Sequence, residues 1–103
     1  VLEENSNFNS MLAMLYAAEF GESFQKGDEK RGEKYQKLFE DFYSTQNITI
    51  MSPQVIGQAY SEACVYFFKK GQKTKAKQYL QKGLEIVPDD MQLKMRRQML
   101  SGG

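Results

Sequence analysis

The sequence contains no histidine and only one cysteine, Cys64, among its 103 residues. Without histidine the chain lacks the commonest general base and the commonest zinc ligand. One cysteine cannot form an internal disulfide or a thiolate metal cluster. We therefore expect no enzymatic activity, no bound metal and no other cofactor. A lone cysteine favours the cytoplasm and leaves a periplasm open.

Prolines and long apolar runs are also scarce. There are two prolines, and no apolar run approaches the roughly 20 residues that a membrane-spanning helix needs. Long stretches without helix breakers favour helices over a turn-rich β fold. With 41% hydrophobic and 26% charged residues, the composition is typical of a globular domain. We expect one all-α domain over residues 1–103, without membrane contact, forming part of a longer protein.

Charge is unevenly distributed along the chain. Residues 1–51 hold nine acidic and five basic side chains, a net charge of −4, whereas residues 52–103 hold four acidic and nine basic ones, a net charge of +5. Because the two halves carry opposite net charge, head-to-tail contacts between copies of the chain are favoured. Nucleic-acid binding would require aromatic side chains exposed among the lysines. Tyr79, the aromatic residue nearest to them on its helix, has the spacing of a buried residue, so a nucleic-acid partner is not expected.

Apolar residues recur at three- and four-residue spacing, which predicts helices. Five helical segments follow from this pattern: 8–26, 28–45, 53–70, 73–86 and 91–100. Gly27 and Gly71 are typical helix terminators. Ser10, Asn9 or Asn7 can cap the first helix, Ser52 is expected to cap the third through its side chain, and Asp89 or Asp90 can cap the fifth. The first helix is expected to bury a stripe of large residues comprising Phe8, Leu12, Leu15, Tyr16, Phe20 and Phe24.

The first two pairs of helices are related by an offset of 44 residues. Tyr16, Phe24, Lys26, Gly27 and Tyr35 recur as Tyr60, Phe68, Lys70, Gly71 and Tyr79. Repetition at this period indicates a solenoid of stacked helical hairpins. We predict one hairpin over residues 8–45, a second over 53–88 and a final helix over 90–100.

Residues 57–90 resemble one tetratricopeptide repeat. Aromatic residues stand at the pattern's places in Tyr60 and Phe67, small residues in Cys64, Ala76 and Gly83, a large apolar residue in Leu80, the turn glycine in Gly71 and the closing proline in Pro88. Small residues at these places let two helices approach closely, so Cys64 is interpreted as a packing residue. The resemblance implies hairpins stacked as a short right-handed superhelix, about five helices in all.

The first hairpin departs from this pattern, because Phe20 stands at a small-residue place and Ser23 at an aromatic one. We interpret it as a degenerate or atypical hairpin. The helix over 90–100 resembles the polar cap that ends such arrays.

In the resembled family, the first helix of each hairpin lines a concave groove that holds a peptide or a partner helix. Carried onto this chain, the groove residues are Met14, Ala17, Gly21, Phe24, Gln58, Ser61, Glu62, Val65, Phe68 and Lys69. Phe24 and Phe68 are its expected aromatic anchors, although they can also pack against each other or against further helices. Ser61 and Val65 replace the lysine and asparagine that clamp a peptide carboxylate in some members, which argues against that mode of binding.

These patterns predict a non-catalytic protein-interaction module with a protein or peptide partner. A self-associating structural domain of a larger protein is the alternative, since two hairpins are fewer than solenoids normally need. A basic surface that binds an acidic partner or nucleic acid is a further alternative, ranked below the other two.

Overall fold

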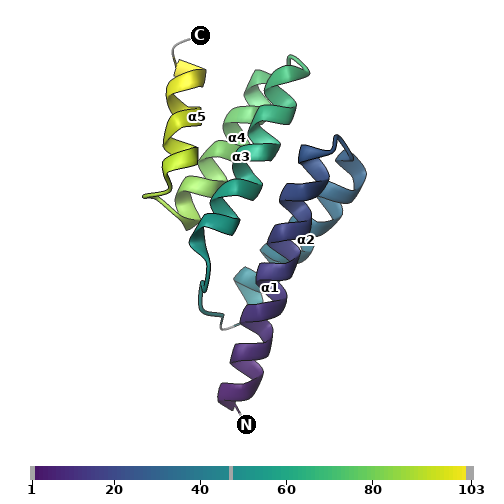
Figure 1. The fold of residues 1–103 in the computed structure, drawn as a ribbon, viewed down its shortest axis with the longest axis vertical. Coiled ribbons are helices and arrows are strands. Elements are labelled where there is room, and N and C mark those ends of the chain that lie inside the picture. The colour runs from purple at the N-terminus through teal and green to yellow at the C-terminus, as the bar shows by residue number, and fades with distance from the viewer. Residues whose placement is uncertain (1, 47, 102–103) are drawn as a thin grey trace.

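The computed structural model of the chain describes the backbone of residues 2–46 and 48–101, and the side chains from residue 8 onward within those ranges (Figure 1). This part of the chain is all helical: α1 (Leu2–Gln25), α2 (Glu29–Thr45), α3 (Pro53–Lys69), α4 (Lys73–Ile86) and α5 (Met91–Ser101). The predicted all-α class and the predicted succession of five helices are confirmed. None of these helices is long and apolar enough to cross a membrane.

The helices form two hairpins and a terminal helix. α1 packs on α2, α3 packs on α4, and the hairpins meet mainly through α1 and α3, while α5 covers α3 and α4. In Figure 1, α1, α3 and α5 run in one direction and α2 and α4 return in the other. The result is an elongated body of 50 × 27 × 18 Å, in which α1, α3 and α5 are the helices available to line a common face.

The turns within the two hairpins have the same geometry. Gly27 and Gly71 adopt φ angles of 83° and 81°, in the left-handed region. The amide of Asp28 bonds to the carbonyl of Ser23 at 2.8 Å, and that of Gln72 bonds to Phe67 at 2.9 Å. These are Schellman bonds, which satisfy carbonyls left free at a helix end. The 44-residue relationship seen in the sequence is therefore also a relationship of backbone structure.

Small residues bring α3 and α4 together as predicted. Cys64 and Ala76 have no exposed surface. A Cβ atom added to Gly83 would lie 2.8 Å from the Cβ of Tyr60 and 2.8 Å from Leu93, so only glycine fits this crossing. The predicted close contact within the second hairpin is confirmed.

The first helix differs from its prediction in its start and in its buried face. It begins at Leu2, so Ser10 lies inside the helix, where its hydroxyl accepts the amide of Thr49 at 2.8 Å rather than capping. Phe8 and Leu15 are 63% and 61% exposed, whereas Ala13 is fully buried. Because α1 approaches α3 through small residues, the helix is rotated so that these two large side chains face outward.

Aspartates cap two of the other helices. The Asp28 carboxylate accepts the amide of Arg31 at 3.2 Å, and Asp90 accepts the amide of Leu93 at 3.0 Å. Asp90, not Asp89, is therefore the cap of α5. Ser52 precedes α3 without making a side-chain cap bond, so that part of the prediction is wrong. Pro53 at the first helical position still favours a helix start there.

Aromatic rings and a polar network join the two hairpins. Phe24 lies 5.5 Å from Phe67 and 5.8 Å from Tyr79, measured between ring centroids. The Tyr79 hydroxyl donates to Gln36 at 2.6 Å. The Tyr60 hydroxyl donates to Glu40 at 2.7 Å, and burial, followed by Glu40, raises the pKa of Tyr60. The hairpins are thus locked in one register.

Ion pairs use part of the charge asymmetry inside the molecule. Glu29 pairs with Lys70 at 2.8 Å, and the hydrogen bond from Lys70 lowers the pKa of Glu29. Two further pairs follow along α2, Glu33 with Lys75 at 3.5 Å and Glu40 with Lys82 at 3.7 Å. Three glutamates of α2 therefore face lysines of the second hairpin, which leaves less opposite charge for contacts between copies.

Candidate functional site

The seam between α1 and α3 is the first candidate site. Its floor is made of small residues, because a Cβ added to Gly21 would lie 3.0 Å from the Cα of Ala59. Above this floor lies a hollow of about 350 Å³, and a second hollow of about 210 Å³ follows along the same seam. Gln25 lines both hollows, so together they form one shallow groove. We call this the α1/α3 groove.

The structure brings most of the predicted groove residues together here. Ala17, Gly21 and Gln58 line the first hollow, and Glu62, Val65 and Lys69 line the second. They come from two helices separated by more than 30 residues in sequence, so their meeting depends on how the hairpins stack. The walls carry both acidic and basic side chains. On the α1 side, Glu22 and Lys26 form an ion pair at 2.6 Å.

The four remaining predicted residues contribute little or no exposed surface to the groove. Phe24 touches the edge of the second hollow but is only 2% exposed, so it cannot serve as an aromatic anchor for a partner. Ser61 is fully buried and accepts a hydrogen bond from Arg96 of α5 at 3.0 Å. Met14 and Phe68 are half-buried and line neither hollow. Phe24 and Ser61 are thus packing residues, because each faces a neighbouring helix.

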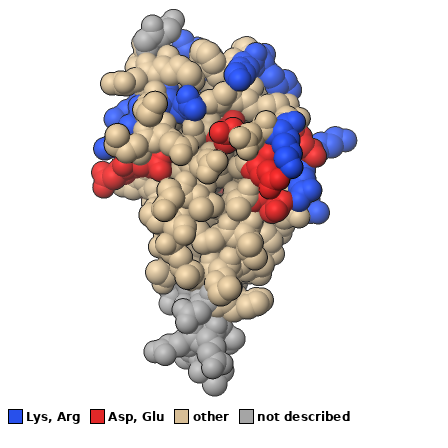
Figure 2. All heavy atoms as spheres, viewed as in Figure 1, with Lys and Arg blue, Asp and Glu red and all other residues tan. Residues whose placement is uncertain are grey.

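An exposed apolar stripe continues the groove along α1. Phe8, Met11 and Leu15 are 63%, 57% and 61% exposed, at spacings of three and four residues that place them on one helix face. Figure 2 shows charged side chains gathered over the half that holds the hairpin turns, while the tan surface below them shows no charged side chain in this view. Sequence reasoning missed this surface because the same spacing also predicts a buried face.

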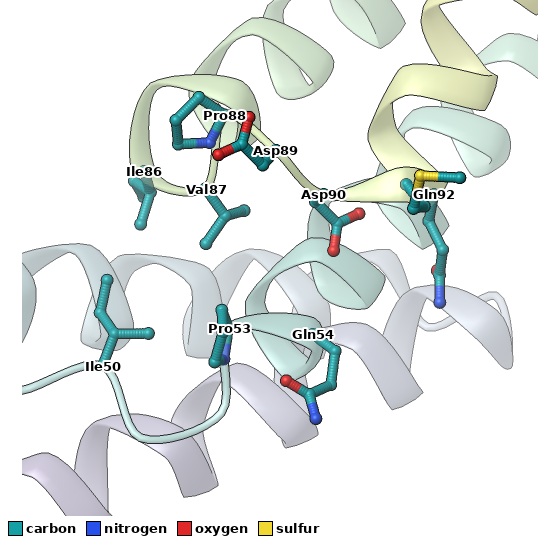
Figure 3. Close-up of a pocket in the computed structure, with 10 residues that line it drawn as sticks. Ile50, Pro53, Gln54, Ile86, Val87, Pro88, Asp89, Asp90 and Gln92 are labelled. Atoms are coloured by element: carbon teal, nitrogen blue, oxygen red, sulfur yellow. The ribbon is translucent and has the colours of Figure 1, made fainter.

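A larger hollow lies next to the N-terminus of α3, away from the α1/α3 groove. The sequence did not predict it. It has a volume of about 630 Å³ and lies between the residues around the start of α3 and the α4–α5 turn. In Figure 3, Ile86 and Val87 face Ile50 and Pro53 across it, with Asp90 at one end. We call this the α4–α5 pocket. Its sequence signal is the apolar run that ends α4 at Ile86, Val87 and Pro88.

Chemically reactive groups are few in the described part of the chain. Cys64 is buried, and burial raises the pKa of its thiol to about 11, so the thiol is protonated at neutral pH. Within residues 8–46 and 48–101, whose side chains the structure describes, no group of three or more Cys, Asp or Glu side chains is placed to bind a metal ion. One polar hollow on α1 and α2 contains the ion pair of Glu19 with Arg31. Beside it, the Ser23 hydroxyl is buried without a partner.

The ring of Tyr79 is not exposed for stacking with a nucleic-acid base. It is 6% exposed, and its ring stacks on Phe67 with centroids 5.1 Å apart. The Nζ atom of Lys75 lies over the ring of Phe67, 4.4 Å from its centroid. A base-stacking role for Tyr79 would require opening of the interface between the hairpins.

No protein-family model matches the chain, and neither a curated protein nor a solved structure shows significant similarity to it.

Proposed function

We propose that the chain is a non-catalytic protein-interaction module of tetratricopeptide-like architecture, which binds a peptide or helix of a partner protein along the α1/α3 groove. The observation that supports this most is the convergence of groove residues chosen from two hairpins on a single seam. Small residues on the floor allow a partner backbone to approach closely, and the neighbouring stripe of Phe8, Met11 and Leu15 supplies apolar contact area. The acidic and basic side chains on the walls fix the orientation of the bound peptide more than they raise its affinity.

Selection of peptides from a random library on the immobilised chain tests the proposal. Ala18 is an exposed residue that lines the groove, so Ala18→Arg fills the groove without disturbing the core. Gln81→Arg on exposed α4 is the matched control. Selected peptides should lose at least tenfold in affinity with Ala18→Arg and keep it with Gln81→Arg. Failure to select any binder, or equal binding by both variants, contradicts the proposal.

Self-association is a second candidate function, favoured by exposed apolar side chains at both ends of the array. Besides the α1 stripe, Met91 and Met95 of α5 are 71% and 60% exposed. Light scattering coupled to size-exclusion chromatography, at low and high salt, tests it. A monomer at high protein concentration in low salt would exclude head-to-tail contacts driven by the oppositely charged halves.

A further inference from the structure

The α4–α5 pocket combines an apolar interior with acidic residues. Ile50 and Pro53 form one wall, Ile86 and Val87 form the other, and Met91 also lines the pocket. A hollow of about 630 Å³ lies within the range typical of ligand sites. The lining residues include the carboxylates of Asp89 and Asp90 and no lysine or arginine. An occupant must therefore present both apolar surface and positive charge.

The charges around the pocket leave a net negative site. Asp89 is 99% exposed, and its ion pair with Lys94 is 3.8 Å long, so this pair neutralises the carboxylate only weakly. The C-terminal end of α4 at Ile86 adds a partial charge of about −0.5, and the N-terminal ends of α3 at Pro53 and of α5 at Met91 each add about +0.5. The helix ends together therefore contribute about +0.5, which is less than the charge of the two carboxylates.

We propose that the α4–α5 pocket binds a basic–apolar peptide segment of a partner protein, in which an aliphatic side chain adjoins a lysine or arginine. The aliphatic group fills the space between the two apolar walls. The cation lies at the end marked by Asp90, which is held in place by its bond to the Leu93 amide, and the exposed Asp89 carboxylate is its second partner in exchange for the long ion pair with Lys94. This site is separate from the α1/α3 groove and does not depend on it.

Titration of the intact chain with three short peptides tests this site. The probes are acetylated and amidated tripeptides with the sequences leucine–arginine–leucine, leucine–glutamine–leucine and glycine–arginine–glycine. Methyl resonances of Ile50, Val87 and Met91 report binding by NMR. We expect saturable shifts with the first peptide, binding about three- to fivefold weaker with the second, and none with the third. Absence of saturable shifts, or equal affinity for the first two peptides, overturns the proposal.

Variants separate the contributions of charge and apolar surface. Asp89→Asn should reduce the preference for arginine over glutamine, with Asp90 still present, while the glutamine peptide binds as before. Met91→Glu should weaken binding of the glutamine peptide, and Met95→Glu, one turn away on the same helix and outside the pocket lining, should not. If the peptides instead shift the methyl resonance of Ala18, they occupy the α1/α3 groove, which refutes the pocket assignment and leaves the proposed function standing.

Discussion

The two hairpins share a turn and a pair of tyrosines but bury their corresponding phenylalanines differently. Tyr16 lies 6.2 Å from Tyr35 in the first hairpin, and Tyr60 lies 6.4 Å from Tyr79 in the second, at similar interplanar angles. Phe24 and Phe68 also correspond by the 44-residue offset, yet Phe24 is buried and Phe68 is half-buried. Phe24 packs against Phe67 and Tyr79 of the second hairpin, whereas the second hairpin is followed in the stack by the single helix α5. Neighbours in the stack, rather than local sequence, therefore decide what such a residue does.

The strongest test of this comparison truncates the two phenylalanines. Phe24→Ala should lower the free energy of unfolding by about 3–5 kcal/mol, the usual loss for a fully buried ring. Phe68→Ala should cost less than half of that, because its ring already contacts water in the native state. Urea unfolding followed by circular dichroism measures both values. Equal losses would mean that the hairpins are energetically equivalent at this position.

A double-mutant cycle at Gly32 tests why the first hairpin needs glycine where the second has Ala76. A Cβ at Gly32 would lie 2.5 Å from the Phe24 ring. Gly32→Ala should therefore destabilise the chain by about 1–3 kcal/mol through overpacking. In a Phe24→Ala background the same change should stabilise by up to about 1 kcal/mol, the helix propensity of alanine over glycine. The same sign in both backgrounds would remove Phe24 as the cause.

Alkaline pH should lower the free energy of unfolding through two buried tyrosines of the second hairpin, Tyr60 and Tyr79. Burial raises the pKa of Tyr60 and Tyr79 above that of the unfolded chain. Their contribution to stability is fully present below about pH 10 and is lost as pH rises further, by about 1.4 kcal/mol per pH unit for each group. Tyr60→Phe should reduce this slope by the contribution of one tyrosine, about 1.4 kcal/mol per pH unit. An unchanged slope between pH 10 and 11 in urea titrations would show that Tyr60 ionises freely in the folded state.

The turn glycines should respond alike, in contrast to the phenylalanines. A Cβ added to Gly27 or to Gly71 would meet no atom within 4 Å, so the positive φ angle is the sole penalty. Gly27→Ala and Gly71→Ala should each lower stability by about 1 kcal/mol. Thermal unfolding of the two variants measures this. A difference larger than the experimental error would mean that the repeated turns are not equivalent.

The smallest effect is expected for the exposed ion pairs between the hairpins. Lys70→Gln should weaken stability slightly in low salt, because it removes the partner that lowers the pKa of Glu29. The difference from wild type should vanish in about 1 M salt, where charges are screened within about 3 Å. Lys73→Gln is the control, because Lys73 is exposed and forms no ion pair with the side chains that the structure describes. An effect independent of salt would argue against an electrostatic cause.

Much of the second hairpin could be predicted from the sequence, and less of the first. Small residues at Cys64, Ala76 and Gly83 dictate one close crossing, which explains why the burial of α3 and α4 was predictable. In α1 the small residues Ala13 and Ala17 compete with large ones for the buried face. Periodicity alone cannot decide that competition, because both sets repeat at helical spacing.

The groove shows the same division. Residues such as Gln58 and Glu62 were predictable because a helix face is fixed by spacing. Ser61 and Phe24 were not, since their burial depends on Arg96 of α5 and on the second hairpin. The α4–α5 pocket was missed for the same reason, because its walls come from segments more than 30 residues apart.

By itself the sequence determined the helices, their turns at Gly27 and Gly71, and the internal repeat, since these depend on backbone preference and spacing within a few residues. The tertiary structure decided which face of α1 is buried, which charges are paired and where the hollows lie. Those features depend on contacts between distant segments, whose geometry follows from the stacking of whole hairpins.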